Sequence, residues 1–157
     1  MRIALLTVSD RCARGEREDL GGAALRRLLE GRGVRPAEAA VVPDEREAIS
    51  AELVRMSDEL GADVILTTGG TGLGPRDVTP EATEAVIARR APGIAEALRA
   101  AGLGSTPRAM LSRGTAGLRG RTLIVNLPGS PRAAEEGLEV LWPVLEHAVE
   151  MIAGKGH

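Results

Sequence analysis

Residues 67–81, TTGGTGLGPRDVTPE, place three glycines within four positions directly after a short apolar run, ADVIL. Such a run predicts a buried strand, and glycines at its end let the backbone approach a ligand closely. Thr79 and Pro80 follow as an N-cap and a first-turn proline, so a helix is expected to begin there. A strand, a glycine loop and a helix in this order indicate a binding site for phosphate.

Neither of the two common glycine-loop motifs fits this segment. A Walker loop needs a lysine after the glycines, and the only lysine of the chain is Lys155. A dinucleotide fingerprint needs a third glycine where this chain has Pro75, counting from Gly70, or Asp77, counting from Gly72. The loop instead carries a carboxylate, Asp77, and a carboxylate beside phosphates indicates a metal ion between them.

Short apolar runs alternate with helical patterns along the chain, which predicts an α/β fold. We expect a three-layer sandwich with a mostly parallel central sheet and helices on both faces, formed by one domain over residues 1–157. The expected strands are 3–8, 39–42, 64–66, 109–112 and 122–126. The expected helices are 20–30, one opening at Asp44, 80–90, 92–101, and one starting at Ser130 and Pro131.

Composition excludes several classes of protein. The net charge is -2 and the aromatic content is 1%, with Trp142 as the one aromatic residue, so a nucleic-acid-binding surface is not expected. A single cysteine, Cys12, cannot form an intrachain disulfide and indicates a reduced compartment. The first apolar run is too short for a signal peptide, and no run approaches a membrane span. We therefore expect a cytoplasmic protein without a membrane association.

A second loop, NLPGSPR at residues 126–132, also follows an apolar strand and opens a helix. Ligands of open α/β sheets bind beyond the carboxyl ends of the strands. The pairs Ser9-Asp10 and Pro43-Asp44 and the loops at Gly69 and Gly129 should all lie at that edge. The four segments are expected to share one pocket.

Five motifs together resemble one family. VSDR near the start, VVPDE, TTGGTGLGPRDVTPE, LSRGTAG and LIVNLPGSP occur in the order and spacing of molybdenum cofactor biosynthesis proteins of the MogA and MoaB type. The chain departs from that pattern at Glu45, where an aspartate commonly follows the Pro-Asp pair. The resemblance implies a molybdopterin adenylyltransferase, which joins AMP from Mg-ATP to the terminal phosphate of molybdopterin, releases pyrophosphate and passes its product to a downstream molybdate-insertion protein.

The resemblance implies that Asp44 and Asp77 are the catalytic residues and the Mg²⁺ ligands. Each also has a structural interpretation: Asp44 could cap a helix in a capping box with Glu47, and Asp77 could bond the backbone near Thr79 in an Asx turn. The glycines could serve only to turn the chain. The residues expected to bind the pterin phosphate and the nucleotide are Ser9, Asp10, Pro43, Gly69, Gly70, Thr71, Gly72, Ser112, Arg113, Gly129 and Ser130.

The resemblance also implies a homotrimer. We expect two apolar patches of the kind that mark an interface, one with Trp142 and Val149 on the last helix and one with Ile94 and Leu98 after Pro92. The alternative function is a non-catalytic molybdopterin carrier of the same fold, because a fold alone does not fix an activity.

Overall fold

The computed structural model describes residues 1–155, and within them the chain forms one six-stranded sheet. The strand order is β2-β1-β3-β6-β5-β4. The pairs β1-β2, β1-β3 and β3-β6 are parallel, whereas β5 runs antiparallel to both β6 and β4. The predicted mostly parallel sheet is confirmed. The strands are β1 (Ile3–Val8), β2 (Glu38–Val42), β3 (Val64–Thr68), β4 (Arg89–Arg90), β5 (Ala116–Arg119) and β6 (Thr122–Leu127).

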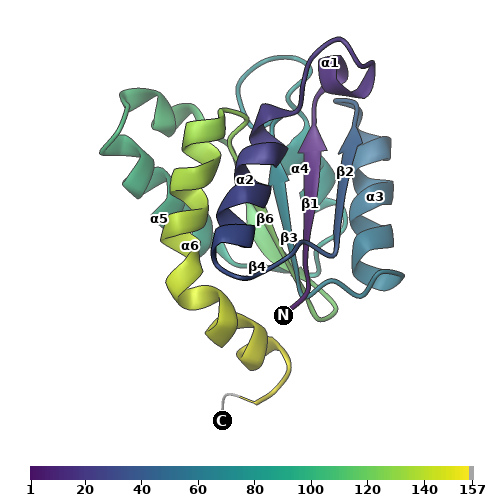
Figure 1. Ribbon diagram of the computed structural model, residues 1–157, viewed down its shortest axis with the longest axis vertical. Helices are drawn as coiled ribbons and strands as arrows, with labels where there is room; N and C mark the ends of the chain where they lie inside the picture. The colour runs from purple at the N-terminus through teal and green to yellow at the C-terminus, as the bar shows by residue number, and fades with distance from the viewer. Residues whose placement is uncertain (156–157) are drawn as a thin grey trace.

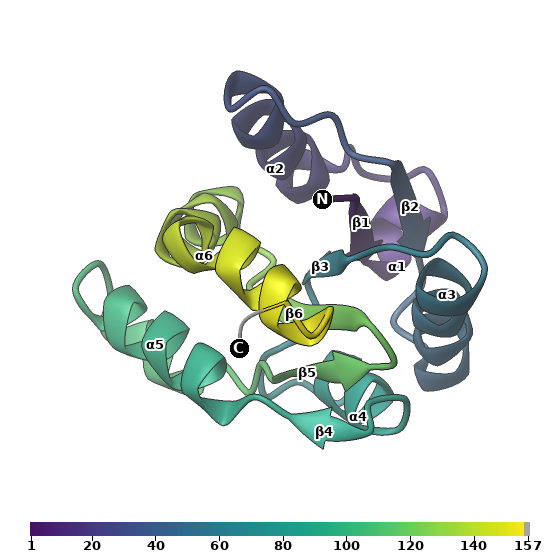
Figure 2. The same ribbon diagram turned by 90° about the horizontal axis from the view of Figure 1, so that it is seen from below.

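Helices cover both faces of the sheet, which confirms the three-layer sandwich (Figures 1 and 2). Helices α2, α5 and α6 pack on one face, while α3 and α4 pack on the other. The helices are α1 (Asp10–Ala13), α2 (Leu20–Gly31), α3 (Arg46–Asp58), α4 (Thr79–Glu84), α5 (Pro92–Leu103) and α6 (Pro131–Ile152), with a 3-10 helix, η1 (Pro107–Leu111).

The central strands are buried on both sides, so they are apolar without alternation. In β1, Ile3 and Leu5 pack into the core beneath α2 and α6, while Ala4 and Leu6 pack beneath α3. Edge strand β2 alternates between partly buried and exposed residues, as expected of a strand with one covered face. The burial of both faces fixes the register of the parallel strands, and with it the edge at which their carboxyl ends meet.

The predicted helix over 80–90 is wrong in its second half. Helix α4 ends at Glu84, and Arg89–Arg90 form the edge strand β4. The amides of Ala88 and Ala91 donate to Leu118 and Ala116 of the neighbouring strand, both at 2.8 Å. Pairing with β5 therefore satisfies backbone groups that a longer helix would have bonded internally.

The predicted strand over 109–112 is also wrong, because Pro107–Leu111 form the 3-10 helix η1. Thr106 caps it by accepting a hydrogen bond from the Arg108 amide at 3.3 Å. Strand β5 lies instead between the two expected strands 109–112 and 122–126, within the glycine- and arginine-rich segment RGTAGLRGR. Gly117 fits there because a Cβ would stand 2.5 Å from Ile87 and 2.6 Å from the Arg89 carbonyl oxygen.

The two apolar patches expected on the surface are packed in the structure. Ile94, Leu98, Trp142 and Val149 are partly buried and pack against the core on the face covered by α2, α5 and α6. The large apolar side chains with the most exposure lie elsewhere, among them Leu73, Met110 and Val144. No helix in residues 1–155 is long and apolar enough to cross a membrane.

Candidate active site

The segments that follow β1, β2, β3 and β6 lie together at the carboxyl edge of the parallel strands, at the top of Figure 1. The Ser9 amide donates to the Val42 carbonyl at 3.0 Å, which joins the β1 and β2 ends. The Gly69 amide donates to the Leu127 carbonyl at 3.2 Å, which joins the β3 and β6 ends. The predicted meeting of these segments at one edge is confirmed.

Two of the loop glycines are required by the backbone. Gly69 and Gly70 have φ values of +101° and +68°, a region that disfavours other residues. A Cβ at Gly69 would stand 2.3 Å from the Val8 carbonyl oxygen. Thr79 closes the turn from the far side, since its hydroxyl donates to the Gly69 carbonyl at 2.9 Å and its amide to the Gly70 carbonyl at 3.1 Å. Thr79 is thus the first residue of α4 and not its N-cap, which is Val78.

The Asp77 carboxylate turns back into the glycine loop. Its Oδ2 accepts a hydrogen bond from the Gly74 amide at 2.9 Å and lies where a Cβ on Gly72 or Gly74 would approach within 2.9 or 2.8 Å. The Asx turn toward Thr79 does not form. Because no described residue donates to Oδ1, Asp77 can cap its own loop through one oxygen and offer the other to a ligand.

Asp10 and Asp44 bind each other reciprocally. The Asp10 amide donates to Asp44 Oδ2 at 2.8 Å, and the Asp44 amide donates to Asp10 Oδ1 at 3.0 Å. The predicted capping role of Asp44 is wrong: α3 begins at Arg46, and its N-cap residue Glu45 makes no side-chain capping bond. The carboxylate of Asp44 is oriented toward the β1 loop instead.

The electrostatics of these carboxylates differ. Burial raises the pKa of Asp44, and the negative charges of Asp10 and Asp77 raise it further. Arg76 lowers the pKa of Asp10 through a two-pronged hydrogen bond, with Nε 2.9 Å from Oδ2 and Nη2 2.9 Å from Oδ1. Among residues 1–155, Asp44 therefore has no cationic partner of its own, and it lies close to a second carboxylate, Asp77.

This donor set suits Mg²⁺. The ion prefers oxygen ligands and is usually held by one or two carboxylates together with substrate phosphates. In residues 1–155 no three acidic, histidine or cysteine side chains converge as a ready-made metal cluster. Asp44 and Asp77 fit a site that phosphate oxygens complete, and their role as Mg²⁺ ligands stays a prediction.

A cavity of about 300 Å³ opens between the β1, β3 and β6 ends. Ser9, Gly69, Gly129 and Ser130 line it, but Asp10 and the Pro43-Asp44 pair do not, so three of the four segments expected in one pocket share this cavity. Ser130 caps α6 by accepting a hydrogen bond from the Ala133 amide at 3.4 Å, which confirms the predicted N-cap. The sequence reasoning missed other residues of this wall, which are Thr7, Val8, Cys12, Arg17, Glu18, Asp19, Leu20, Gly21, Thr68 and Pro131.

The sequence around Asp19 could have indicated this part of the cavity. Asp19 caps α2 by accepting a hydrogen bond from the Gly22 amide at 2.8 Å, and it also accepts one from the Thr7 hydroxyl at 2.7 Å. An aspartate before a helix with two leading glycines predicts an N-terminus with free amides. The N-terminus of a second helix, α2, therefore lies at this cavity together with that of α6.

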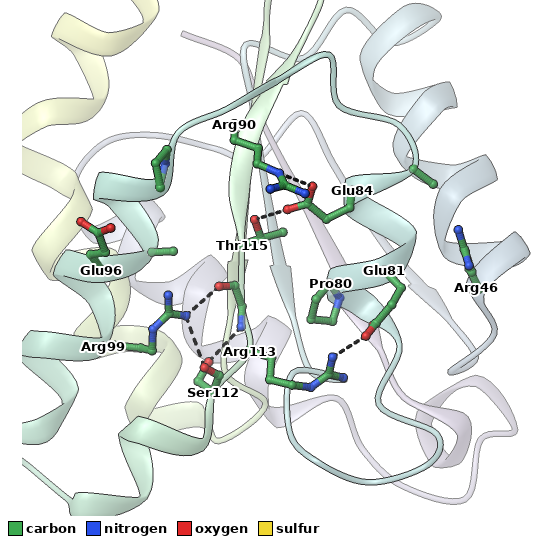
Figure 3. Close-up of a pocket in the computed structure, with 14 residues that line it drawn as sticks. Arg46, Pro80, Glu81, Glu84, Arg90, Glu96, Arg99, Ser112, Arg113 and Thr115 are labelled. Carbon is green, nitrogen blue, oxygen red and sulfur yellow. Dashed lines mark hydrogen bonds and ion pairs between the residues drawn. The ribbon is translucent and has the colours of Figure 1, made fainter.

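Ser112 and Arg113 do not line this cavity. They lie on a larger one, about 720 Å³, between α4, α5 and the segment 112–115 that precedes β5 (Figure 3). The Arg113 guanidinium braces the glycine loop: Nε donates to the Gly72 carbonyl at 2.8 Å, Nη2 to the Asp77 carbonyl at 2.6 Å, and Nη1 pairs with Glu81. Phosphate binding by Arg113 stays a prediction.

The sequence and the fold are similar to those of known molybdenum cofactor biosynthesis proteins. Residues 4–147 match the family model described as "Probable molybdopterin binding domain". The chain is 42% identical over 156 residues to a molybdopterin adenylyltransferase of Helicobacter pylori, covering 98% of this chain and 89% of the relative. It is also 42% identical to a molybdenum cofactor biosynthesis bifunctional protein of Chlorobaculum tepidum, covering 99% of this chain and 50% of that protein. The crystal structure of the molybdopterin biosynthesis enzyme MoaB from Thermus thermophilus superposes with a TM-score of 0.91 at 52% identity, covering 98% and 97% of the two chains.

Proposed function

This chain belongs to the molybdopterin-binding domain family, and we propose that it is a molybdopterin adenylyltransferase of molybdenum cofactor biosynthesis. The observation that carries the proposal is the pair of carboxylates, Asp44 and Asp77, set at a glycine loop beside a cavity with two helix N-termini. Relatives named for this activity match the chain over nearly its whole length. The substrates are ATP and molybdopterin.

The reaction is a nucleotidyl transfer. An oxygen of the terminal phosphate of molybdopterin attacks the α-phosphorus of ATP, a new P–O bond forms, and the bond to the β-phosphate breaks to release pyrophosphate. Such transfers depend on positioning and charge neutralisation more than on a side-chain nucleophile. A Mg²⁺ ion held by Asp44 and Asp77 would neutralise the phosphate charge.

We assign different residues to different parts of the two substrates. Gly70, Thr71 and Ser130 are assigned to the pterin phosphate, because free amides at helix N-termini favour an anion. Ser9, Gly69 and Gly129 form the adjoining wall of the smaller cavity. The remaining predicted contacts to the nucleotide and the pterin are Asp10, Pro43, Gly72, Ser112 and Arg113.

The proposal also includes a downstream partner, a cellular compartment and an oligomeric state. The adenylylated product passes to a molybdate-insertion protein, and the bifunctional relative of Chlorobaculum tepidum supports a close link between this domain and a second step. We place the protein in the cytoplasm, as a homotrimer with one site per subunit. A non-catalytic carrier is the alternative function, and the presence of both Asp44 and Asp77 argues against it.

The test is a direct assay. The protein is incubated with ATP, Mg²⁺ and molybdopterin, and the adenylylated pterin and pyrophosphate are measured. Asp77→Asn keeps an oxygen that can accept from the Gly74 amide, so the loop should keep its conformation while a metal ligand is weakened. We expect this variant to bind the pterin normally and to lose activity by about 10²-fold or more.

Two results would contradict the proposal. Parent protein that binds the pterin but forms no adenylylated product would identify a carrier. Turnover of Asp77→Asn within a few-fold of the parent would show that Asp77 takes no part in the reaction. The assignment of the adenylyltransferase activity itself would then still stand.

A further inference from the structure

The segment 71–77 of the glycine loop has little apolar anchorage. Residues 73–76 are exposed, and Leu73 at its tip is 66% exposed. Inside the segment, Asp77 and Gly74 bond each other, with the Asp77 amide 3.0 Å from the Gly74 carbonyl. Because the segment carries Asp77, polar contacts from outside it decide where that carboxylate lies.

Within the described residues, hydrogen bonds from outside the segment come from only two residues, Arg113 and Asp10. Arg113 holds three carbonyl groups of the segment from the side of the larger cavity. On the opposite side, Arg76 extends from the segment to both oxygens of Asp10, which lies 66 residues away in sequence. A guanidinium that meets both oxygens of a carboxylate fixes orientation as well as distance.

Asp10 passes this constraint to Asp44. The reciprocal bonds of 2.8 and 3.0 Å tie the two aspartates rigidly at the ends of β1 and β2. Since Arg76 precedes Asp77 directly, the chain of contacts runs from Asp44 through Asp10 and Arg76 to Asp77. The two proposed metal ligands thus stand at the ends of one path that consists of hydrogen bonds and the peptide bond between Arg76 and Asp77.

We propose that Arg76 is a positioning residue: by gripping Asp10 it sets the separation of Asp44 and Asp77 and so prepares the two carboxylates to act together. The part of this inference that concerns turnover rests on the proposed function. The part that concerns the loop does not, because the contacts exist in the ligand-free protein.

The first measurement is hydrogen exchange of peptides covering 71–77 in the free protein. Arg76→Ala should speed exchange of this segment several-fold while leaving β1 and β3 unchanged. Arg14→Ala is the matched control, since Arg14 is equally exposed, 59% at the side chain, and also pairs with a carboxylate through two nitrogens. Its partner Glu16 lies on the same turn, and Arg14 also stands near enough to Asp10 to lower the pKa of that carboxyl.

The second measurement is steady-state adenylyl transfer. Arg76→Ala should lower kcat roughly ten- to a hundredfold, the scale of a small misplacement of catalytic groups, while the KM for molybdopterin stays within about twofold. Arg76→Lys keeps the charge but cannot grip both oxygens, so its kcat should stay close to that of Arg76→Ala. Asp10→Asn should act in the same direction, and combining it with Arg76→Ala should add little further loss.

Three outcomes would overturn the inference. Unchanged hydrogen exchange of residues 71–77 in Arg76→Ala would show that the hydrogen bonds from Arg76 to Asp10 do not hold the loop. Full rescue by lysine, or a harmless Asp10→Asn, would mean that Arg76 acts through its charge on the phosphates. Equal effects of Arg76→Ala and Arg14→Ala would reduce its role to general electrostatics. An enzyme without adenylyl transfer at all would refute the proposed function, and the exchange experiment would still decide the role of Arg76.

Discussion

The surroundings of the Asp44 carboxyl disfavour its ionised form. Burial raises the pKa of its carboxyl, and Asp10 and Asp77 add repulsion. A carboxyl whose pKa is higher in the folded than in the unfolded state weakens the fold when it ionises. The penalty is absent below the unfolded pKa, grows as the pH rises through the folded pKa, and is complete above it.

Asp44→Asn is therefore expected to stabilise the fold at pH 7 while abolishing adenylyl transfer. The asparagine can still accept from the Asp10 amide, and the gain should be roughly 0.5 kcal/mol, because solvent screens a carboxyl that is only partly buried. The free energy of unfolding is measured by denaturant titration of both proteins from pH 7 down to pH 4. The difference should shrink as the pH falls. A variant that is less stable than the parent at pH 7 would contradict this expectation.

Single residues were predicted well where local rules decide them. Ser130 as an N-cap and Gly69 and Gly70 as turn residues follow from neighbouring sequence, and the structure confirms them. The bonds that Asp44 and Arg76 make could not be predicted, because their partner Asp10 is 34 and 66 residues away. Only the fold brings those groups within hydrogen-bond distance.

One buried amide joins several elements behind the glycine loop. Asn126 on β6 donates to the hydroxyls of Thr67 on β3 and Thr83 on α4, both at 3.0 Å. Its Oδ1 accepts from the Thr115 amide at 3.1 Å, just before β5. Asn126 was expected in a ligand-facing loop, and its side chain is instead inside the protein, where it fixes α4 against the sheet.

Asn126→Ala should lower the free energy of unfolding by about 2–3 kcal/mol, since it leaves the buried hydroxyls of Thr67 and Thr83 and the partly buried amide of Thr115 without their Asn126 partner. Thr83→Val removes only one of these bonds and should cost about 1 kcal/mol. Denaturant titration gives both values. A loss below about 0.5 kcal/mol for Asn126→Ala would mean that the network contributes little to the docking of α4.

Elements were predicted correctly where a long apolar stripe or a buried run defined them, as in α6 and β1. The errors lie in short elements, where the sequence is compatible with both a helix and a strand. Val86 and Ile87 could continue a helix by periodicity, but they pack against the core beneath α4 and lead into β4. The Thr106-Pro107 pair carried the same helix-start signal as Ser130-Pro131, and it indicated η1 instead of a strand.

At the scale of the whole molecule, α5 and η1 project beyond α6, at the left of Figure 1. Gly102 allows this hairpin to close, because a Cβ there would stand 2.8 Å from the Ala109 Cβ. Leu103, Met110 and Leu111 on the hairpin are 48%, 62% and 49% exposed. Grouped apolar side chains at this exposure commonly mark an interface. We therefore expect subunit contact at this hairpin and not at the two patches inferred from the sequence.

We expect a homotrimer whose cyclic interface includes this hairpin. Met110→Asp should dissociate it, because an aspartate in an apolar interface is buried without a partner. Val144→Asp is the matched control, since Val144 is 51% exposed on α6, away from the hairpin. Sedimentation equilibrium at micromolar concentration should give three times the 16.4 kDa subunit mass for the parent and for Val144→Asp, and a smaller species for Met110→Asp. A monomeric parent would refute the assembly, and a dimer that Met110→Asp dissociates would keep the interface while correcting the stoichiometry.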